Sequence, residues 1–280
     1  MKNERSIDKT APLVLERCLL KPGKKLILSK PGKAEARIFP EKQDEDAMLE
    51  KLHAKLAKLQ GLLYAQHEHK VLIVLQGMDT SGKDGTIKHV FKGVNPQGVR
   101  VANFKEPTKE ELDHDYLWRI HAQMPKKGEV VIFNRSHYED VVAVRVHDLV
   151  GREAWERRFA QINDFERMLV EEGTVILKFF LNIDKDEQKE RLQERLSDPE
   201  KNWKFSAADL HERKFWKKYM AAYKDALEQT TTKHAPWFVV PSDKKWRRNL
   251  AVSLIIIETL KRLKMEYPKP FKGLRKISVK

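Results

Sequence analysis

The sequence predicts an α/β fold, a doubly wound parallel sheet with helices on both faces, and three observations support it. Short apolar segments alternate along the chain with longer segments whose apolar residues recur every three or four positions. The first short segment, residues 71–75, is apolar throughout, which is typical of a strand buried on both faces. A glycine-rich loop follows it directly and opens a helical pattern, as at the carboxyl edge of a parallel sheet.

The predicted elements begin with an amphipathic helix from Asp44 to about His69. Strands are expected at residues 71–75, 99–103, 129–134, 174–181 and 237–240. Helices are expected at about 84–93, 109–122, 153–172, 184–197, 206–229 and 244–265.

These elements form three layers, α/β/α, in one predicted domain. It covers residues 41–265 and includes a helical lid at about 190–225. Residues 1–40 are punctuated by proline and glycine, so we expect an extended N-terminal arm without a core of its own. Residues 266–280 are expected to be a basic C-terminal tail.

Composition narrows the class of protein. Of the 280 residues, 41% are hydrophobic and 34% charged, which excludes collagen-like and low-complexity chains. The longest apolar run, residues 251–257, is shorter than the roughly 20 residues that span a bilayer. The single cysteine, Cys18, suits a reducing compartment, so we expect a soluble cytoplasmic protein.

The charge balance predicts a polyanionic partner. Lysine and arginine number 55 against 41 aspartate and glutamate, a formal net charge of +14. Nucleic acid, a phosphorylated substrate and an acidic membrane surface all fit such an excess. The alternative is a surface whose charges are simply solvated, so the motifs must decide.

The loop after the first strand has the spacing of a phosphate-binding motif, G-x-x-x-x-G-K. Its small residues let backbone N–H groups point at phosphate oxygens, and the next helix presents its positive end there. Asp84 stands where a serine or threonine usually binds Mg²⁺, so Asp79 is the expected oxygen ligand. The alternative is an ordinary turn that contains a lysine. The predicted phosphate-binding residues are Gly77, Thr80, Ser81, Gly82, Lys83 and Gly85.

A charged segment, residues 134–140, follows the third strand and should meet the same sheet edge. Arg135 would clamp a transferred phosphoryl group, and Glu139 or Asp140 would hold Mg²⁺ or orient an acceptor. The alternative is a simple helix start with Ser136 as its N-cap and acidic residues in the first turn.

The predicted lid is rich in cations. Arg191 and Arg195 share one helix face despite their like charges, which suggests an anion between them. The alternative is that Glu187 pairs with Arg191 within the helix. Pro199 ends this helix, and the segment after it is expected to be a flap. The cations expected to form a groove for a polyanion are Lys83, Lys88, Lys92, Arg135, Arg191, Arg195, Lys201 and Lys204.

The motifs at residues 77–85, 133–140, 191–205 and 230–237 together resemble the polyphosphate kinase 2 family, over roughly residues 10–265. The resemblance implies a fold similar to thymidylate kinase, a P-loop kinase domain, and phosphoryl transfer between inorganic polyphosphate and nucleotides. It implies Mg²⁺ as the cofactor, with Mn²⁺ as a substitute, positioned by Asp79 and Glu139. The catalytic residues that we predict are Asp79, Lys83, Arg135 and Glu139.

Residues 138–140 read Tyr-Glu-Asp where most members show Tyr-Asn-Arg. This variant resembles the subgroup that phosphorylates both nucleoside monophosphates and diphosphates, so we expect reversible conversion of AMP to ADP and of ADP to ATP. Adenine or guanine nucleotides are the expected acceptors, in a homo-oligomer without a membrane or nucleic-acid partner. The alternatives are an ATP-dependent nucleoside monophosphate kinase and a nucleic-acid-binding P-loop protein.

Overall fold

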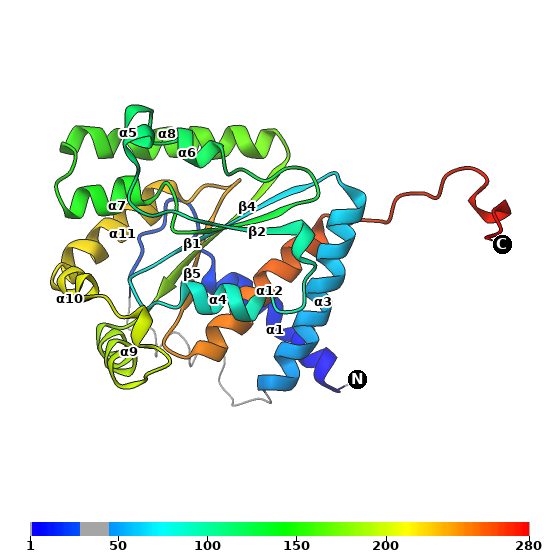
Figure 1. Cartoon of the computed structure of the whole chain (residues 1–280), viewed down its shortest axis with the longest axis horizontal. Coiled ribbons are helices and arrows are strands. Elements are labelled where there is room, and N and C mark those ends of the chain that lie inside the picture. Colours follow the sequence, from blue (N-terminus) through cyan, green and yellow to red (C-terminus); the bar gives the residue numbers. More distant parts are fainter. Residues whose placement is uncertain (1, 29–44, 280) are drawn as a thin grey trace.

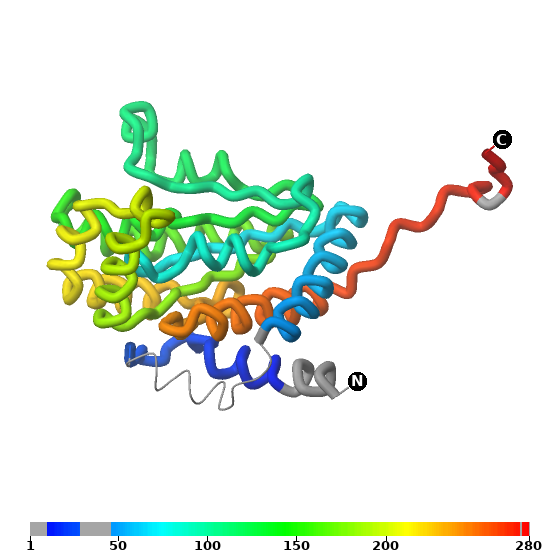
Figure 2. Tube along the Cα trace, turned by 60° about the horizontal axis from the view of Figure 1, so that its bottom comes forward, coloured from blue at the N-terminus to red at the C-terminus, as the bar shows by residue number. Residues whose placement is uncertain are grey.

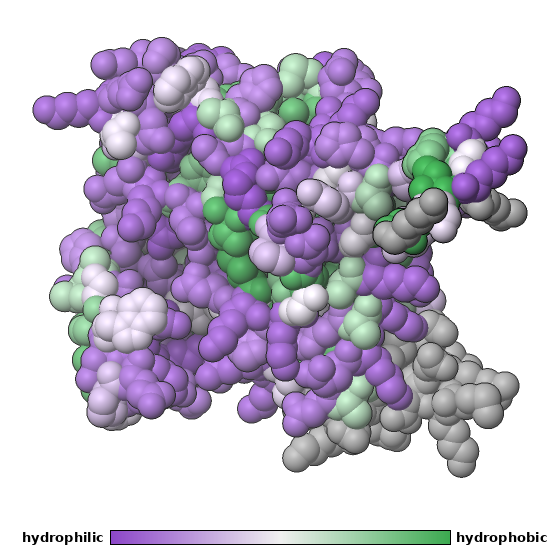
Figure 3. Space-filling model, turned by 45° about the vertical axis from the view of Figure 1, so that its right-hand side comes forward, coloured by the Kyte–Doolittle hydropathy of each residue, from purple (hydrophilic) through white to green (hydrophobic). Residues whose placement is uncertain are grey.

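The computed structural model describes the backbone of residues 2–28 and 45–279, and side chains from Thr10 on within those ranges except Glu45 and Arg275. The described residues form three layers, with a central sheet between two groups of helices (Figure 1). The face seen in Figure 3 is largely hydrophilic, in line with the charged composition.

Five parallel strands in the described residues form one sheet in the order β2-β3-β1-β4-β5. The doubly wound parallel sheet predicted from the sequence is therefore confirmed. Because all strands run the same way, their carboxyl ends lie at one edge, where Leu75 of β1 is paired with Asn134 of β3. The strands are β1 (Lys70–Gln76), β2 (Val99–Asn103), β3 (Val130–Asn134), β4 (Thr174–Asn182) and β5 (Trp237–Pro241).

Both faces of the sheet are buried, as the unbroken apolar run of β1 indicated. Val71, Ile73 and Leu75 belong to the core on one face, together with helices α1, α3 and α12. Leu72 and Val74 belong to the core on the other face, together with α7, α8 and α11. Alternate residues of β1 thus serve two separate cores, which is why no polar position interrupts it.

The helices that cover the sheet connect its strands in sequence order (Figure 1). The longer ones are α1 (Lys2–Cys18), α3 (Glu45–Gln66), α4 (Lys83–Val90), α7 (Glu139–Val146), α8 (Arg152–Glu171), α9 (Lys185–Ser197), α10 (Ala207–Lys214), α11 (Trp216–Thr230) and α12 (Lys245–Arg262). The short ones are α5 (Lys109–Asp113), α6 (Trp118–His121) and the 3₁₀ turns η1 (Pro96–Gly98), η2 (Asn202–Lys204) and η3 (Leu274–Lys276).

Two predicted helices are each broken in two. The stretch 109–122 forms α5 and α6, because His114 leaves the helical conformation and the Asp115 side chain accepts a hydrogen bond from the Leu117 N–H. The stretch 206–229 forms α10 and α11, which meet at Phe215 with non-helical backbone angles. In each case a local turn interrupts the helix, although the spacing of hydrophobic residues predicts one continuous helix.

The N-terminal region differs from the extended arm expected from its prolines and glycines. Residues 2–18 form helix α1, and Ala11, Val14 and Cys18 are buried in the core beside α12. Burial raises the pKa of the Cys18 thiol to about 12. Residues 19–28 of that arm are not helical, and the Leu20 N–H donates to the Trp237 carbonyl at 2.9 Å, as expected of an arm that lies on the domain. Residues 29–40 lie outside the described residues.

At the other end, residues 266–279 lead away from the body of the molecule (Figure 2). The apolar side chains of this segment are exposed, including Tyr267 and Phe271. Among the described residues, no helix is both long and apolar enough to span a bilayer.

Candidate active site

The phosphate-binding loop predicted between β1 and α4 has the backbone that such a loop needs. Gly77, Thr80 and Gly82 all have positive φ angles, of 148°, 64° and 101°. A Cβ atom on Gly77 would lie 2.7 Å from the carbonyl oxygen of Leu181, and one on Gly82 would overlap the guanidinium of Arg248. Glycine is therefore required at both positions by close packing as well as by conformation.

Three hydroxyl groups of this segment are buried without a hydrogen-bond partner among the described residues: those of Thr80, Ser81 and Thr86. Buried polar groups in proteins are nearly always hydrogen-bonded, so groups left without a partner call for an explanation. Thr80 and Ser81 lie in the loop of phosphate-binding sequence, where a polar ligand is the partner that we expect for them, whereas Thr86 lies inside α4.

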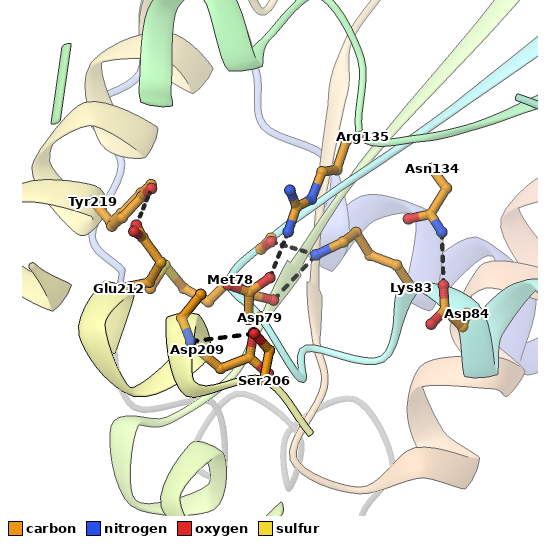
Figure 4. A network of polar contacts seen from close by, with 12 residues as sticks. Met78, Asp79, Lys83, Asp84, Asn134, Arg135, Ser206, Asp209, Glu212 and Tyr219 are labelled. Carbon is orange, nitrogen blue, oxygen red and sulfur yellow. Dashed lines mark hydrogen bonds and ion pairs between the residues drawn. The ribbon is translucent and has the colours of Figure 1, made fainter. Parts of the chain in front are cut away.

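Lys83, the first residue of α4, is almost fully buried. Its ammonium group donates hydrogen bonds to the carbonyl oxygens of Gly77 at 2.7 Å and Met78 at 3.2 Å, so the side chain bends back across the loop (Figure 4). Burial and the nearby Arg135 lower the pKa of Lys83. The loop thus concentrates positive charge where an anion would bind.

Arg135 and Asp79 join the ends of the two neighbouring strands. Arg135 directly follows β3 with a φ of 63°, a strained conformation for a residue with a side chain. This turn directs its guanidinium to Asp79, which accepts a hydrogen bond at 2.7 Å (Figure 4). Burial acts to raise the pKa of Asp79, but Lys83 and Arg135 outweigh it, and the pKa lies below its usual value. Asp79 is therefore ionised at neutral pH.

Asp84, at the position where the motif usually has a serine or threonine, is tied to the strand edge. Its carboxylate accepts a hydrogen bond from the Asn134 side-chain amide at 2.6 Å, and that amide also donates to Asn103 at 3.0 Å (Figure 4). The carboxylate therefore links the start of α4 to the ends of β3 and β2.

The charged segment after β3 is both a helix start and part of the site. Glu139 and Asp140 occupy the first turn of α7. Burial acts to lower the pKa of Arg135, but the Glu139 charge outweighs it and the pKa is raised. Burial raises the pKa of Asp140 to about 6. In the alternative interpretation Ser136 caps α7, and it does not, because the helix begins after Tyr138. Its hydroxyl instead accepts hydrogen bonds from the Tyr138 N–H and the Gln76 side-chain amide.

A cavity of about 520 Å³ adjoins the loop and is lined by Asp79, Arg135 and Glu139. This volume is in the range of small-ligand sites. Its other walls come mainly from the segment 104–119 and from α10 and α11. The two helices fall largely within the lid predicted at about 190–225, but no residue of these walls was among the predicted site residues. In the wall formed by the two helices, Tyr219 donates to Glu212 at 2.6 Å, and His147 contacts the same carboxylate (Figure 4). No motif identifies these residues, since they meet only in the folded chain.

The predicted lid cations fall into two groups. Arg191 is 7% exposed and donates to the carbonyl oxygens of Thr80 at 2.8 Å and Ser242 at 2.6 Å. It also pairs with Glu187 at 2.8 Å, the alternative that the helix spacing left open. Arg195 is more exposed and pairs with Asp209 of α10 at 2.9 Å.

The other predicted groove lysines are not gathered at the loop. Lys201 pairs with Glu194 and Asp198, and Lys204 lies over the exposed ring of Trp203. Lys92 pairs with Glu50 of α3 at 2.9 Å, and Lys88 is exposed on α4. Their part in phosphate binding stays a prediction.

The carboxylates beside the phosphate loop are suitable ligands for a divalent cation. Within the part of the chain that the structure describes, no three histidine, cysteine, aspartate or glutamate side chains cluster to form a complete metal site. Mg²⁺ however usually binds to one or two carboxylates, water and the phosphates of the substrate. Asp79 and Glu139, which line the same cavity beside the phosphate loop, offer that incomplete set.

A buried ionic cluster lies behind the charged segment and was missed from the sequence. Lys178 of β4 and Glu166 of α8 are fully buried and paired at 2.6 Å. Both contact the Tyr138 hydroxyl, at 2.9 and 2.7 Å, and Glu166 also contacts His137 at 3.3 Å. A charged residue within an apolar strand such as β4 is the one signal that would have indicated it.

Known proteins resemble this chain over most of its length. Residues 40–268 match the family model for polyphosphate kinase 2. An AMP/ADP-polyphosphate phosphotransferase of Meiothermus ruber is 58% identical over 228 residues, 81% of this chain and 85% of that protein. An ADP-polyphosphate phosphotransferase of Rhodopseudomonas palustris is 44% identical over 267 residues, 91% of this chain and 92% of that protein.

A solved structure agrees with these sequence matches. The crystal structure of polyphosphate kinase 2 from Arthrobacter aurescens TC1 superposes with a TM-score of 0.88 at 45% identity, and covers 92% of each chain. The family model, the relatives and the fold all agree with the motifs at the carboxyl edge of the sheet. The chain belongs to the polyphosphate kinase 2 family.

Proposed function

We propose that this protein transfers phosphoryl groups from inorganic polyphosphate to AMP and to ADP, in a reversible, Mg²⁺-dependent reaction. One observation carries the proposal. The loop that contains buried Lys83, and hydroxyls without a hydrogen-bond partner among the described residues, lies beside the Asp79–Arg135 ion pair and adjoins a cavity of about 520 Å³. Phosphoryl transfer needs little proton chemistry and depends on holding and neutralising phosphates, which this arrangement suits.

Each charged group would have a separate role that follows from its position. The loop backbone and Lys83 would hold the phosphoryl group in transfer, and Arg135 would neutralise the charge that develops on its oxygens. Asp79 and Glu139 would hold Mg²⁺, which supplies charge neutralisation between donor and acceptor phosphates when bound. Mn²⁺, with similar oxygen ligands, would replace it.

The acceptor nucleotide would occupy the cavity, whose walls mix aromatic and charged side chains such as Phe104, Arg119 and Tyr116. The polyphosphate chain would approach from the lid, where Arg195, Lys201 and Lys204 offer exposed charge. Glu139 would mark the enzyme as one that accepts both mono- and diphosphates. Use of guanine nucleotides, a homo-oligomeric state and a cytoplasmic location stay predictions.

An exchange of donors tests the proposal. Purified protein is incubated with AMP, Mg²⁺ and either polyphosphate or ATP, and AMP, ADP and ATP are resolved over time. We expect polyphosphate to give ADP first and ATP later, and EDTA to stop both steps. Efficient phosphorylation of AMP by ATP without polyphosphate would favour an ATP-dependent monophosphate kinase instead, and ADP without later ATP would overturn only the dual-acceptor proposal.

A further inference from the structure

Arg248, in the first turns of α12, is a buried cation beside the phosphate loop. Only 2% of the surface of Arg248 is exposed to solvent. Its guanidinium donates to the Asn249 side-chain oxygen at 3.1 and 2.9 Å, and to the Ser81 carbonyl at a long 3.5 Å. All these partners are neutral.

The neighbouring arginines are different. Arg135 is paired with Asp79 and Arg191 with Glu187, whereas Arg248 has no carboxylate partner among the described residues. Burial lowers the pKa of Arg248 to about 9, and the nearby Arg191 charge adds to the effect. A buried charge without a counter-charge costs several kcal/mol even after the protein relaxes. Such a cost calls for a compensating anion.

The loop glycines allow this close approach. A Cβ on Gly82 would overlap the guanidinium, and a Cβ on Gly85 would lie 3.2 Å from its Nη2 atom. Gly85 has no positive φ in this structure, so its backbone alone does not demand glycine. The guanidinium therefore packs directly against the backbone of the loop at Gly82 and of the first turn of α4 at Gly85.

We propose that Arg248 is a positioning residue of the phosphate loop, whose buried charge is compensated by the polyphosphate group bound there. It acts through Gly82 and the Ser81 carbonyl, holding the loop in its anion-binding conformation and adding to its positive potential. This proposal rests on the proposed function only in assuming that the loop binds phosphate. It predicts that Arg248 matters more for the anion-bound protein than for the free one.

The test compares Arg248→Met with a matched control, Arg247→Met. Arg247 is the preceding residue of the same helix and stacks on Trp246 at 5.1 Å. The melting temperature of each protein is measured with and without tripolyphosphate, in the absence of nucleotide. KM for polyphosphate, KM for AMP and kcat are measured separately.

We expect free Arg248→Met to melt at or above the temperature of the parent, because the uncompensated charge is gone. Its stabilisation by tripolyphosphate should fall, with an affinity loss of about tenfold, because a nearby buried positive charge no longer attracts the anion. KM for polyphosphate should rise by the same factor while KM for AMP stays unchanged, and Arg247→Met should keep both KM values and the stabilisation by tripolyphosphate of the parent.

Two results would overturn the proposal. If Arg248→Met lowers the melting temperature of the free protein yet gains as much from tripolyphosphate as the parent does, the arginine only supports the fold. If tripolyphosphate fails to stabilise even the parent, the phosphate loop itself is misassigned and the proposed function fails with it. Should Arg248→Met not fold, Arg248→Gln removes the same charge but keeps hydrogen-bonding atoms, and an unchanged KM for polyphosphate in that variant would equally contradict the proposal.

Discussion

Arg191 and Arg195 are one helical turn apart on α9, and their surroundings are opposite. Arg191 is buried and holds the Thr80 carbonyl of the phosphate loop and the Ser242 carbonyl after β5. Arg195 has a side chain 21% exposed and pairs with one carboxylate, Asp209, and one carbonyl, that of Lys204.

The difference indicates which cation a polyphosphate chain can recruit. A phosphate can take the place of Asp209 beside Arg195 without disturbing the backbone of the phosphate loop, because the partly exposed guanidinium would exchange one anionic partner for another. It can replace the partners of Arg191 only by releasing the loop backbone. Helix spacing places both arginines on one face, but burial assigns Arg191 to the scaffold and leaves Arg195 as the one of the two that we propose for the polyphosphate path.

Lys83 extends the comparison of the two arginines. Like Arg191 it is buried and donates to carbonyl oxygens of the phosphate loop, but it lies within the loop motif and is proposed to hold the transferred phosphoryl group. Lys83→Ala should reduce transfer by about 10²–10³-fold or more, as for the loss of one transition-state charge contact. Steady-state kinetics measure it, with exposed Lys58→Ala of α3 as the control. Activity within a few-fold of the parent would remove Lys83 from the mechanism.

The scaffold role of Arg191 predicts a large effect on stability. Arg191→Ala removes the partner of Glu187 and of three backbone carbonyls, those of Thr80, Ser242 and Asp243, so the free energy of unfolding should fall by about 3–5 kcal/mol. Arg195→Ala should lose less, about 1–2 kcal/mol, because Arg195 keeps some contact with solvent and has one carboxylate and one carbonyl partner. Urea unfolding measures the free energy of unfolding of both variants. Equal decreases in the two would contradict the distinction between the two arginines.

A smaller effect concerns pH. Burial raises the pKa of Asp140 to about 6, whereas an unfolded aspartate titrates near 3.9. The folded protein therefore binds the proton more tightly, and this group costs stability as the pH rises from about 4 to about 6.

Asp140→Asn removes this titrating group. As the pH rises from about 4 to about 6, the free energy of unfolding of the variant should therefore increase relative to that of the parent, by at most about 3 kcal/mol. Urea unfolding at pH 4, 5, 6 and 7 follows the difference between the two proteins. Curves that stay parallel over this range would mean that Asp140 titrates alike in the folded and unfolded chains.

The sequence predicted the fold and the loop because their signals are local. The apolar run of β1, the glycine spacing and Lys83 all lie within 15 residues. The burial of Arg191 depends instead on Ser242, 51 positions away, and the cavity joins segment 104–119 to α10 and α11. Arg248 cannot be told from Arg247 by any local pattern, since only the packing of α12 against the loop distinguishes them.

The most direct test of this account is the salt dependence of KM for polyphosphate, because a polyanion that displaces counterions from several cations binds more weakly as salt rises. The slope of log KM against log salt concentration is measured for the parent and for Arg195→Ala. If Arg195 contacts the chain, its removal should raise KM and flatten the slope by about 0.7, the value for one lost contact with a single strand. Equal slopes for the two proteins would mean that polyphosphate does not pass along the lid, and would contradict the account.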